Sequence, residues 1–244
     1  MSTEAALYVY GVVHKRKVPA HLARRGVKLV SSGRVAALVT AVPDEPTRAT
    51  RRALLGHAEI VEDAFEWTTI LPMRFGVVFP DEAAIRAAVL DSNRELLEDL
   101  LERHSSTAEL SLKASYDEEA VLAELVATSP RLARMRERYR ERASMERGMA
   151  LGEVTAAHLA ARRDHDAERI IGTLEPLAVE IRVGEVGLEG GVVSLALLVE
   201  RDRVEQVEEW LESLSRDLSP PIHFKLVGPL PPYSFVDVPL AVAA

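Results

Sequence analysis

The chain contains no cysteine among its 244 residues. This absence excludes disulfide bonds, thiolate metal ligands, cysteine-ligated iron–sulfur clusters and a cysteine nucleophile. The sequence also lacks any apolar run that approaches the roughly 18 to 20 residues of a membrane-spanning helix, and residues 1–6 lack the basic segment of a secretory signal peptide. We therefore expect a soluble, cytoplasmic protein that does not enter a membrane.

The chain has no excess of positive charge, because its formal net charge is −8 and its pI is about 5.5. Affinity for nucleic acid rests largely on accumulated lysine and arginine, so nucleic acid is not expected as a partner. Hydrophobic residues make up 48% of the chain and charged residues 28%, which is typical of a folded protein. The length predicts two domains.

The motifs of familiar catalytic sites are missing as well. Neither G-x-S-x-G nor S-x-x-K with its partner motifs is present, and the glycines within residues 184–191 form neither a Walker loop nor a dinucleotide-binding turn. His57 begins no H-E-x-x-H pattern, and His158 and His165 are about 10 Å apart along a helix, too far to hold one zinc ion by themselves. We therefore assign no catalytic, cofactor-binding or metal-binding residue, and we do not expect an enzyme.

Hydrophobic periodicity predicts strands and helices in the first half of the chain. Apolar runs at residues 5–13, 27–31 and 35–42 predict three strands. Apolar positions at spacings of three and four predict a helix from Leu54 to Phe65. The remaining predictions are a strand over residues 69–79 with Pro72 at an edge or bend, an N-cap at Asp81, and a helix over residues 83–101 interrupted near residues 91–93.

In the second half of the chain, the predicted strands and helices follow one another in the order of a split βαβ unit. Its first crossover, the helical connection between the first two strands, is unusually long. A helical stretch reaches from residue 131 to about residue 174, with Gly148 and Gly152 as its expected weak points. The other predicted elements are strands at residues 108–116, 179–186, 192–200 and 222–227 and helices at residues 117–126 and 204–218.

The predicted fold class is therefore α+β with two domains. Residues 1–105 are expected to form a variant α/β sheet domain, and residues 106–229 a ferredoxin-like domain with the long helical segment at about 131–174. Residues 230–244 are expected to form an extended tail, because their prolines disfavour helix. Since this tail is apolar, we expect it to dock on the chain's own body or on a partner.

The sharpest charge feature lies between Arg131 and Arg147, where seven arginines accompany three glutamates. Spacings of three and four residues allow ion pairs, which favours a solvated helix with internal pairing. The spacings permit such pairs between Glu137 and Arg140, Arg138 and Glu141, and Arg142 and Glu146. The alternative is a basic stripe that docks an acidic partner, with RNA as a weaker third interpretation.

Two aromatic segments that contain proline stand far apart in the sequence, at Leu71–Phe79 and Gly228–Val236. Proline and glycine beside an aromatic residue can fix a bend, which favours either a structural corner or a rigid surface loop that recognises a partner. Trp67, Trp210, Phe65 and Phe224 lie in periodic segments and are expected in the core. The candidate partner-binding residues are Leu71, Pro72, Met73, Arg74, Phe75, Gly76, Pro231, Pro232, Tyr233 and Phe235.

Together with the opening Leu7–Val13, these segments resemble the gas vesicle protein F/L family (GvpF/GvpL), and the resemblance extends over nearly the whole chain. Tyr8, Tyr10 and Gly11 match the family's opening strand. Leu71–Phe79 matches its central segment and Gly228–Phe235 its ending, in which Leu230 stands where the family often has tryptophan.

This resemblance implies a cytoplasmic protein of the gas vesicle that serves as an assembly factor or minor structural component. It implies binding to the hydrophobic, GvpA-like shell protein and to other accessory proteins, without a cofactor. A shell subunit exposes apolar surface before assembly, so a chaperone-like partner that limits its aggregation and assists nucleation is physically reasonable. The alternatives are a ferredoxin-like ligand-sensing regulatory module and an enzyme with an unrecognised site.

Overall fold

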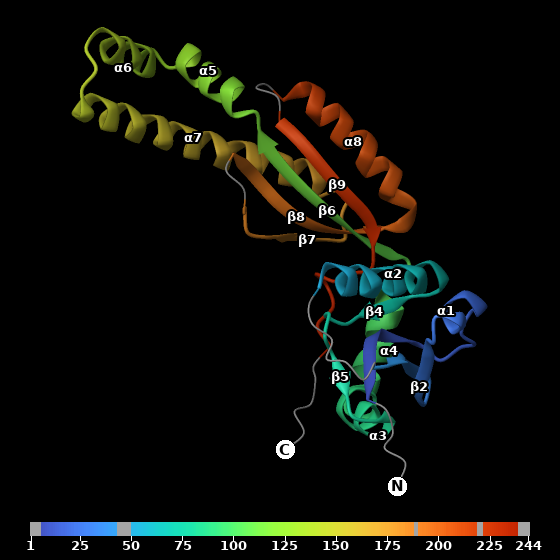
Figure 1. Ribbon diagram of the computed structural model, residues 1–244. Helices are drawn as coiled ribbons and strands as arrows, with labels where there is room; N and C mark the ends of the chain where they lie inside the picture. The colour runs from blue at the N-terminus through green and yellow to red at the C-terminus, as the bar shows by residue number, and fades with distance from the viewer. Residues whose placement is uncertain (1–5, 43–49, 188–189, 219–221, 239–244) are drawn as a thin grey trace. The chain divides into compact units, whose positions relative to one another are not determined.

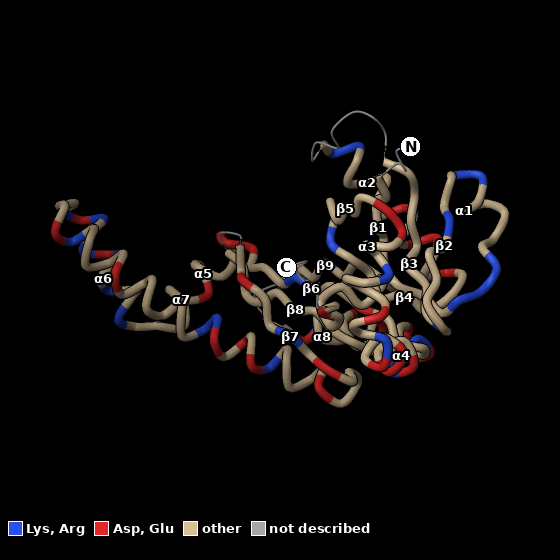
Figure 2. Tube along the Cα trace, turned by 90° about the horizontal axis from the view of Figure 1, so that it is seen from below, with Lys and Arg blue, Asp and Glu red and all other residues tan. Residues whose placement is uncertain are grey.

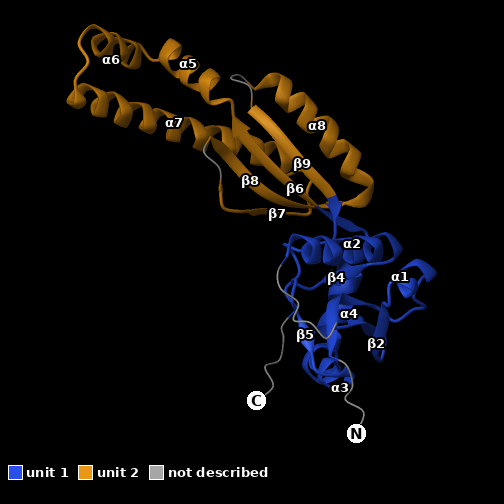
Figure 3. Cartoon of the chain, viewed as in Figure 1, with its two compact units in different colours: residues 1–109, 229–244 blue, residues 110–228 orange. Residues whose placement is uncertain are grey.

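A computed structural model describes residues 6–42, 50–187, 190–218 and 222–238. The chain forms two compact units, shown in different colours in Figure 3. Unit 1 comprises Met1–Glu109 and Pro229–Ala244, and unit 2 comprises Leu110–Gly228. The chain thus passes from unit 1 into unit 2 and returns, and both passages lie within strands.

Unit 1 is built on a sheet in which β1 (Leu7–His14) is the central strand (Figure 1). The strand order is β2-β3-β1-β4, and β5 also pairs with β1. All of these pairs are antiparallel, and the three predicted opening strands are confirmed. The other four strands are β2 (Lys28–Ser32), β3 (Val35–Ala41), β4 (Ile70–Pro72) and β5 (Val78–Phe79).

Helices cover both faces of this sheet because β1 has apolar side chains on both. Tyr8 and Val13 pack with α2 (Arg51–Trp67) on one face, whereas Val9 and Val12 pack with the other helices on the opposite face. These other helices are α3 (Glu82–Ile85), the π-helical turn η1 (Arg86–Asp91) and α4 (Arg94–Arg103), while the short α1 (Ala20–Arg24) joins the α2 side.

The predicted interruption of the helix near residues 91–93 is confirmed. The backbone widens to a π-helical turn, in which the Ser92 hydroxyl donates to the carbonyl of Ala87 at 2.6 Å and the Asn93 amide donates to the carbonyl of Val89 at 3.0 Å. The predicted N-cap is also confirmed, because the Asp81 carboxylate accepts from the backbone N–H of Ala84 at 2.7 Å.

Unit 2 contains a four-stranded sheet with the order β7-β8-β6-β9, so β7 and β9 are its edges. One face packs against α8 and the last part of α7 in a single core, whereas Lys113 and Lys225 on two of its strands are exposed. The strands are β6 (Thr107–Tyr116), β7 (Glu180–Val183), β8 (Gly191–Glu200) and β9 (Ile222–Leu230). The helices are α5 (Glu118–Thr128), α6 (Pro130–Glu141), α7 (Met145–Leu174), the 3-10 turn η2 (Arg201–Arg203) and α8 (Val204–Asp217).

The long helical stretch is two helices, α6 and α7, which pair as a hairpin that projects from the sheet of unit 2 (Figure 1). The chain breaks between them at residues 142–144, so the expectation of a break at Gly148 or Gly152 is wrong. Both glycines lie inside α7. The physical reason is that polar groups satisfy the ends of both helices at the break.

Ser144 and Arg147 provide these end contacts. The Ser144 hydroxyl accepts from the backbone N–H of Arg147 at 3.2 Å and caps α7. The Arg147 guanidinium donates to the carbonyls of Arg138 at 3.2 Å and Arg142 at 3.0 Å, which satisfies the end of α6.

Of the three ion pairs that the spacings permit on this hairpin, one forms, between Arg140 and Glu137 at 3.8 Å. The pairs of Arg138 with Glu141 and of Arg142 with Glu146 do not form within 4.0 Å in the described chain. Most of the arginine side chains on α6 are therefore directed to solvent.

Close packing of β1 on β4 requires glycine at position 11. A Cβ atom there would lie 2.6 Å from the carbonyl oxygen of Leu71 and 2.8 Å from Cγ1 of Ile70. We predict that Gly11→Ala lowers the free energy of unfolding of unit 1 by about 1–3 kcal/mol, because the backbones of β1 and β4 must separate. Chemical denaturation followed by circular dichroism measures this change.

Gly56→Ala is the matched control, since a Cβ atom at Gly56 in α2 would meet nothing within 4 Å. This control should gain about 0.5–1 kcal/mol, because alanine is the better helix former. Equal effects of the two substitutions would contradict the close-packing explanation.

Candidate functional site

The opening and central motif segments meet around the hydroxyl group of Tyr8. This hydroxyl accepts from the backbone N–H of Gly76 at 2.9 Å and lies 2.9 Å from Nδ1 of His57 on α2. The rings of Tyr8 and Phe75 are 6.0 Å apart, and the imidazole of His57 stacks on Tyr10 at 5.4 Å. The result is a packed aromatic cluster that joins β1, α2 and the loop after β4.

The third motif segment also packs on unit 1. Glu109 is 5% exposed, and its carboxylate accepts from the backbone N–H and the hydroxyl of Ser234, both at 2.7 Å. Phe235 is buried, and Val236 and Val238 pack against the core formed with α3 and α4. Docking on the chain's own body is therefore confirmed for residues 230–238, whereas residues 239–244 lie outside the described residues.

The ten candidate partner-binding residues have different environments. Six of them are buried, namely Leu71, Pro72, Met73, Pro231, Pro232 and Phe235. Phe75 is half-buried, and Arg74, Gly76 and Tyr233 are exposed. The backbone N–H of Met73 donates to the carbonyl of Tyr10 at 2.9 Å, so this bend is tied directly to β1. Only the exposed members can contact a partner without local unfolding.

Burial lowers the pKa of His57 below its ordinary value of 6.5, and the backbone carbonyl of Met73 partly opposes this shift. Since the Tyr8 oxygen already accepts from Gly76, its own proton is free to donate to Nδ1 of His57. This arrangement places the ring proton on Nε2, an atom for which the described residues provide no hydrogen-bond partner of good geometry. His57 is therefore neutral in the folded protein near pH 7.

Unit 2 contains a separate polar cluster around Asp166 of α7, which is 1% exposed. Its Oδ2 atom accepts from the hydroxyl of Tyr116 and from Nε of Arg162, both at 2.7 Å, and Arg162 also pairs with Glu124 at 3.2 Å. Burial and the Asp166 carboxylate raise the pKa of Tyr116. This network joins β6, α5 and α7, which is a structural role.

Within the described ranges, no group of three or more His, Cys, Asp or Glu side chains is arranged to hold a metal ion. The imidazole of His158 donates to the carbonyl of Val154 at 2.9 Å and lies 3.5 Å from the hydroxyl of Ser129, and His165 is exposed. No helix in this part of the chain is both long and apolar enough to span a bilayer.

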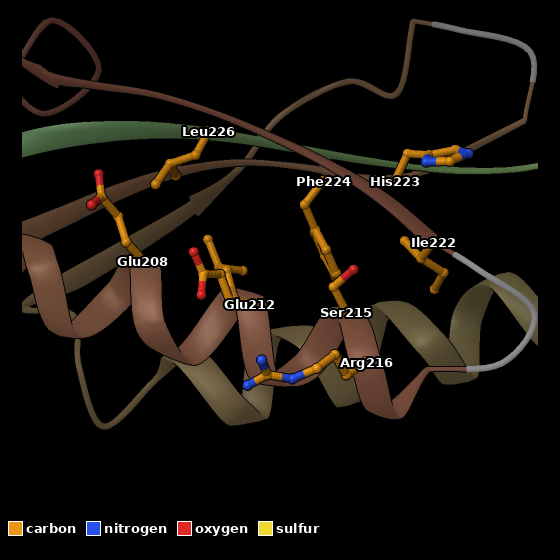
Figure 4. A pocket seen from close by; sticks show the side chains of 9 residues that line it. Glu208, Glu212, Ser215, Arg216, Ile222, His223, Phe224 and Leu226 are labelled. Atoms are coloured by element: carbon orange, nitrogen blue, oxygen red, sulfur yellow. The ribbon is translucent and has the colours of Figure 1, made fainter.

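A groove of about 660 Å³ with both polar and apolar lining residues lies between α8 and the edge strand β9 (Figure 4). Phe224 and Leu226 point from β9 toward the helix, while Glu208 and Glu212 of α8 point toward the strand, and His223 points away. The groove is lined by Glu208, Leu211, Glu212, Ser215, Arg216, Ile222, His223, Phe224 and Leu226. It combines apolar surface, carboxylates and an edge strand, which suits the binding of an apolar protein segment.

A family model described as "Gas vesicle synthesis protein GvpL/GvpF" matches residues 6–237. The chain belongs to the GvpL/GvpF family. It is 34% identical to gas vesicle protein F of Streptomyces sp. (strain CB03234), over 94% of this chain and 99% of that protein. It is 23% identical to gas vesicle protein F of Nostoc sp. (strain PCC 7120), over 96% of this chain and 99% of that protein.

Crystal structures of two family members have the same fold. GvpF from Anabaena sp. PCC7120 superposes with a TM-score of 0.84 at 22% identity, covering 96% of this chain and 99% of that one. GvpF from Microcystis aeruginosa superposes with a TM-score of 0.73 at 21% identity, covering 95% and 99% of the two chains. The expected GvpF/GvpL resemblance is thereby confirmed.

Sequence reasoning missed the groove of this GvpL/GvpF-family chain. The expectation of a core position is confirmed for Phe65, but it is wrong for Trp210, which is 46% exposed on the flank of α8. Phe224 is only half-buried and lines the groove. The alternation of Ile222, Phe224 and Leu226 is the one sequence pattern that relates to the groove. It predicts that these side chains share one face of β9, but it does not predict that part of this face is open to solvent.

We predict that the stability of unit 1 depends on the protonation of His57. Because the folded state lowers this pKa, the unfolded state binds the proton more readily, and stability is complete above pH 6.5 and declines as the pH falls below it. His57→Asn keeps an acceptor for Tyr8 but cannot titrate.

Denaturant unfolding of both proteins at pH 7.5 and pH 5.5 tests this prediction. The wild type should lose more unfolding free energy between these two values than the variant does, since carboxylates titrate in both proteins and cancel in the comparison. Equal losses would show that the His57 proton is not linked to folding.

Proposed function

We propose that this chain is an accessory or minor structural protein of the gas vesicle that binds the hydrophobic shell protein and limits its aggregation. In this proposal it also assists vesicle nucleation and assembly, in the cytoplasm and on the vesicle, without catalysis and without a cofactor. Membership of the GvpL/GvpF family gives the gas vesicle role. The observation that carries the binding step is the groove beside β9, whose lining includes the apolar side chains of Phe224 and Leu226.

The groove supplies two kinds of contact that an apolar shell segment needs. The half-buried faces of Phe224 and Leu226 offer apolar surface, and burying it on binding contributes about 25 cal/mol per Å². The outer edge of β9 faces no further strand of its sheet in the described chain, so its backbone groups can pair with an extended segment. Such pairing would occupy the edge of the shell segment that otherwise promotes aggregation.

A second proposed contact is the pair of exposed side chains in the central and final motif segments, Arg74 and Tyr233, which we call the motif cluster. Arg74 and Tyr233 reach solvent from segments whose buried neighbours hold the backbone in place. Partial burial raises the pKa of Tyr233, with a further contribution from the nearby carboxylate of Glu62, so its hydroxyl stays protonated and able to donate. Two anchored segments, one with an exposed arginine and the other with an exposed tyrosine, are suited to partner recognition.

We further propose that the two compact units are the folding domains of the chain and that unit 2 is a ferredoxin-like domain in which α5, α6 and α7 extend the first crossover. The strand order β7-β8-β6-β9 and the element order of unit 2 support this description. Native-state hydrogen exchange would test it, because core amides of the two units should exchange with two different opening free energies if these units fold independently.

We predict that Phe224→Ser combined with Leu226→Ser weakens capture of the shell protein about tenfold, because the variant removes most of the accessible apolar lining. Co-purification with the shell protein, together with the fraction of shell protein that stays soluble, measures the effect. Circular dichroism and thermal unfolding of the variant establish that the fold is retained.

Val227→Ser is the matched control, since this residue lies on the same strand, is 45% exposed and does not line the groove. Unchanged capture by the folded groove variant would exclude the groove as the binding surface. Loss of capture by Arg74→Ser with Tyr233→Ser in the same assay would instead place binding at the motif cluster.

A further inference from the structure

The tip of the α6–α7 hairpin, defined here as residues 130–149, is strongly basic in an acidic chain. It contains seven arginines and three glutamates and therefore has a net charge of +4, which leaves −12 on the rest of a chain whose total is −8. Figure 2 shows arginine residues, in blue, recurring along α6. The separation of charge is larger than the net charge suggests, and it creates two surfaces of opposite sign.

One row of arginines on α6 has no partner within the described chain. Arg131, Arg134 and Arg138 recur at spacings of three and four, which places them along one side of the helix, and all three are exposed. None of them lies within 4.0 Å of a carboxylate. These charges remain available to a surface outside the hairpin.

Exposed apolar side chains lie at the start of α7, where Arg147 contacts the carbonyl of Arg138 at the end of α6. Met145 is 85% exposed and Met149 67% exposed, and their spacing of four places both on one side of the first turns of α7. Tyr139 is 38% exposed and packs toward Gly148 across the hairpin. Methionine is adaptable and polarizable, and paired exposed methionines are typical of binding surfaces.

Helix α8 has the complementary composition. Five of its residues are acidic and one is basic, and none of its glutamates forms an ion pair within the described part of the chain. Glu205 and Glu209 are exposed one turn apart, and Trp210 beside them is 46% exposed. The outer side of α8 therefore combines unpaired carboxylates with an exposed aromatic ring, as a partner for arginine and methionine requires.

The two surfaces cannot meet within one molecule. Figures 1 and 2 both place α6 at the far end of the hairpin, away from α8 in the same unit. We propose that the hairpin tip docks on the outer side of α8 of a second copy of this chain. Arg134 and Arg138 then face Glu205 and Glu209, while Met145 and Met149 pack against Trp210.

This contact is distinct from the groove assigned to the shell protein. Glu208 and Glu212 point into the groove, whereas Glu205 and Glu209 are centred about a sixth of a turn further around α8, toward the side that bears Trp210. A copy that binds shell protein in its groove can therefore accept a neighbour's hairpin on the outer side. Repeated contacts of this kind would bring several shell-binding grooves together, which raises their effective concentration.

Charge reversal on each side tests the proposal with full-length protein. The tip variant is Arg134→Glu with Arg138→Glu, and the helix variant is Glu205→Arg with Glu209→Arg. Sedimentation velocity over a concentration series measures the mean mass. The wild type should associate reversibly at low salt and weaken about tenfold between 50 mM and 500 mM NaCl, because exposed pairs are screened.

Each variant alone should remain monomeric, since its altered surface then repels the unaltered one, and an equimolar mixture of the two should associate again. The control is Glu208→Arg with Glu212→Arg, which changes the same charge on the groove side of α8 and should weaken association less than the outer reversal does. Met145→Ser with Met149→Ser should weaken association at both salt concentrations, because its contribution is apolar.

A wild type that stays monomeric at low salt, or variants whose mixture does not associate, would overturn the proposal. Equal loss from the outer and groove-side reversals would overturn it as well, since it would show a general charge effect. Shell-protein capture by the tip variant, measured in parallel, separates this proposal from the shell-binding one, because capture by the groove does not require the tip.

Discussion

The position of β1 at the centre of the sheet in unit 1 is the constraint on which the rest of that unit depends. This strand pairs with β3, β4 and β5 and has helices on both of its faces. β4 can approach only because Gly11 has no side chain, and the loop after β4 is fixed because the Tyr8 hydroxyl accepts from Gly76. Segments about 65 residues apart in sequence are thus fixed by one strand.

The sheet of unit 2 is covered differently from that of unit 1. Helices cover one of its faces, and its edge strand β9 lies beside an open groove. The hydrogen bond from the Tyr116 hydroxyl to the buried Asp166 carboxylate holds α7 against β6, so the hairpin that extends from α7 has a firm base. The unit presents a groove on one side and a charged hairpin on another. Its surface, rather than its core, carries the features suited to partners.

Most elements of the fold were predictable from the sequence, because they follow from local patterns. The apolar runs predicted β1, β2 and β3, and the stripe from Leu54 to Phe65 predicted α2. The break between α6 and α7 was not predictable from glycine positions, because side-chain contacts of Ser144 and Arg147 decide where the helices end. Helix ends fixed by long-range or cross-turn contacts leave little trace in periodicity.

The surfaces were harder to predict, and the reason is physical. Periodicity places Phe224 on the apolar face of a strand and Trp210 beside an apolar helix stripe, but it does not reveal which part of that face is left uncovered. Exposure depends on the width of the gap between α8 and β9, which is a tertiary property. The same holds for ion pairs, since a spacing of three or four permits a contact without requiring one, as Arg138 and Glu141 illustrate.

The motif residues that mark the GvpL/GvpF resemblance are for the most part buried, and this changes what the motifs imply. Leu71, Met73 and Phe235 are inaccessible in the folded chain, so they can be required for the fold without touching a partner. In the proposed recognition of a partner, such a segment acts indirectly, because it sets the positions of its exposed neighbours, Arg74 and Tyr233. Family resemblance therefore identifies the architecture of unit 1, whereas the specificity for partners is expected to reside in the groove and the hairpin of unit 2, where the sequence shows no motif.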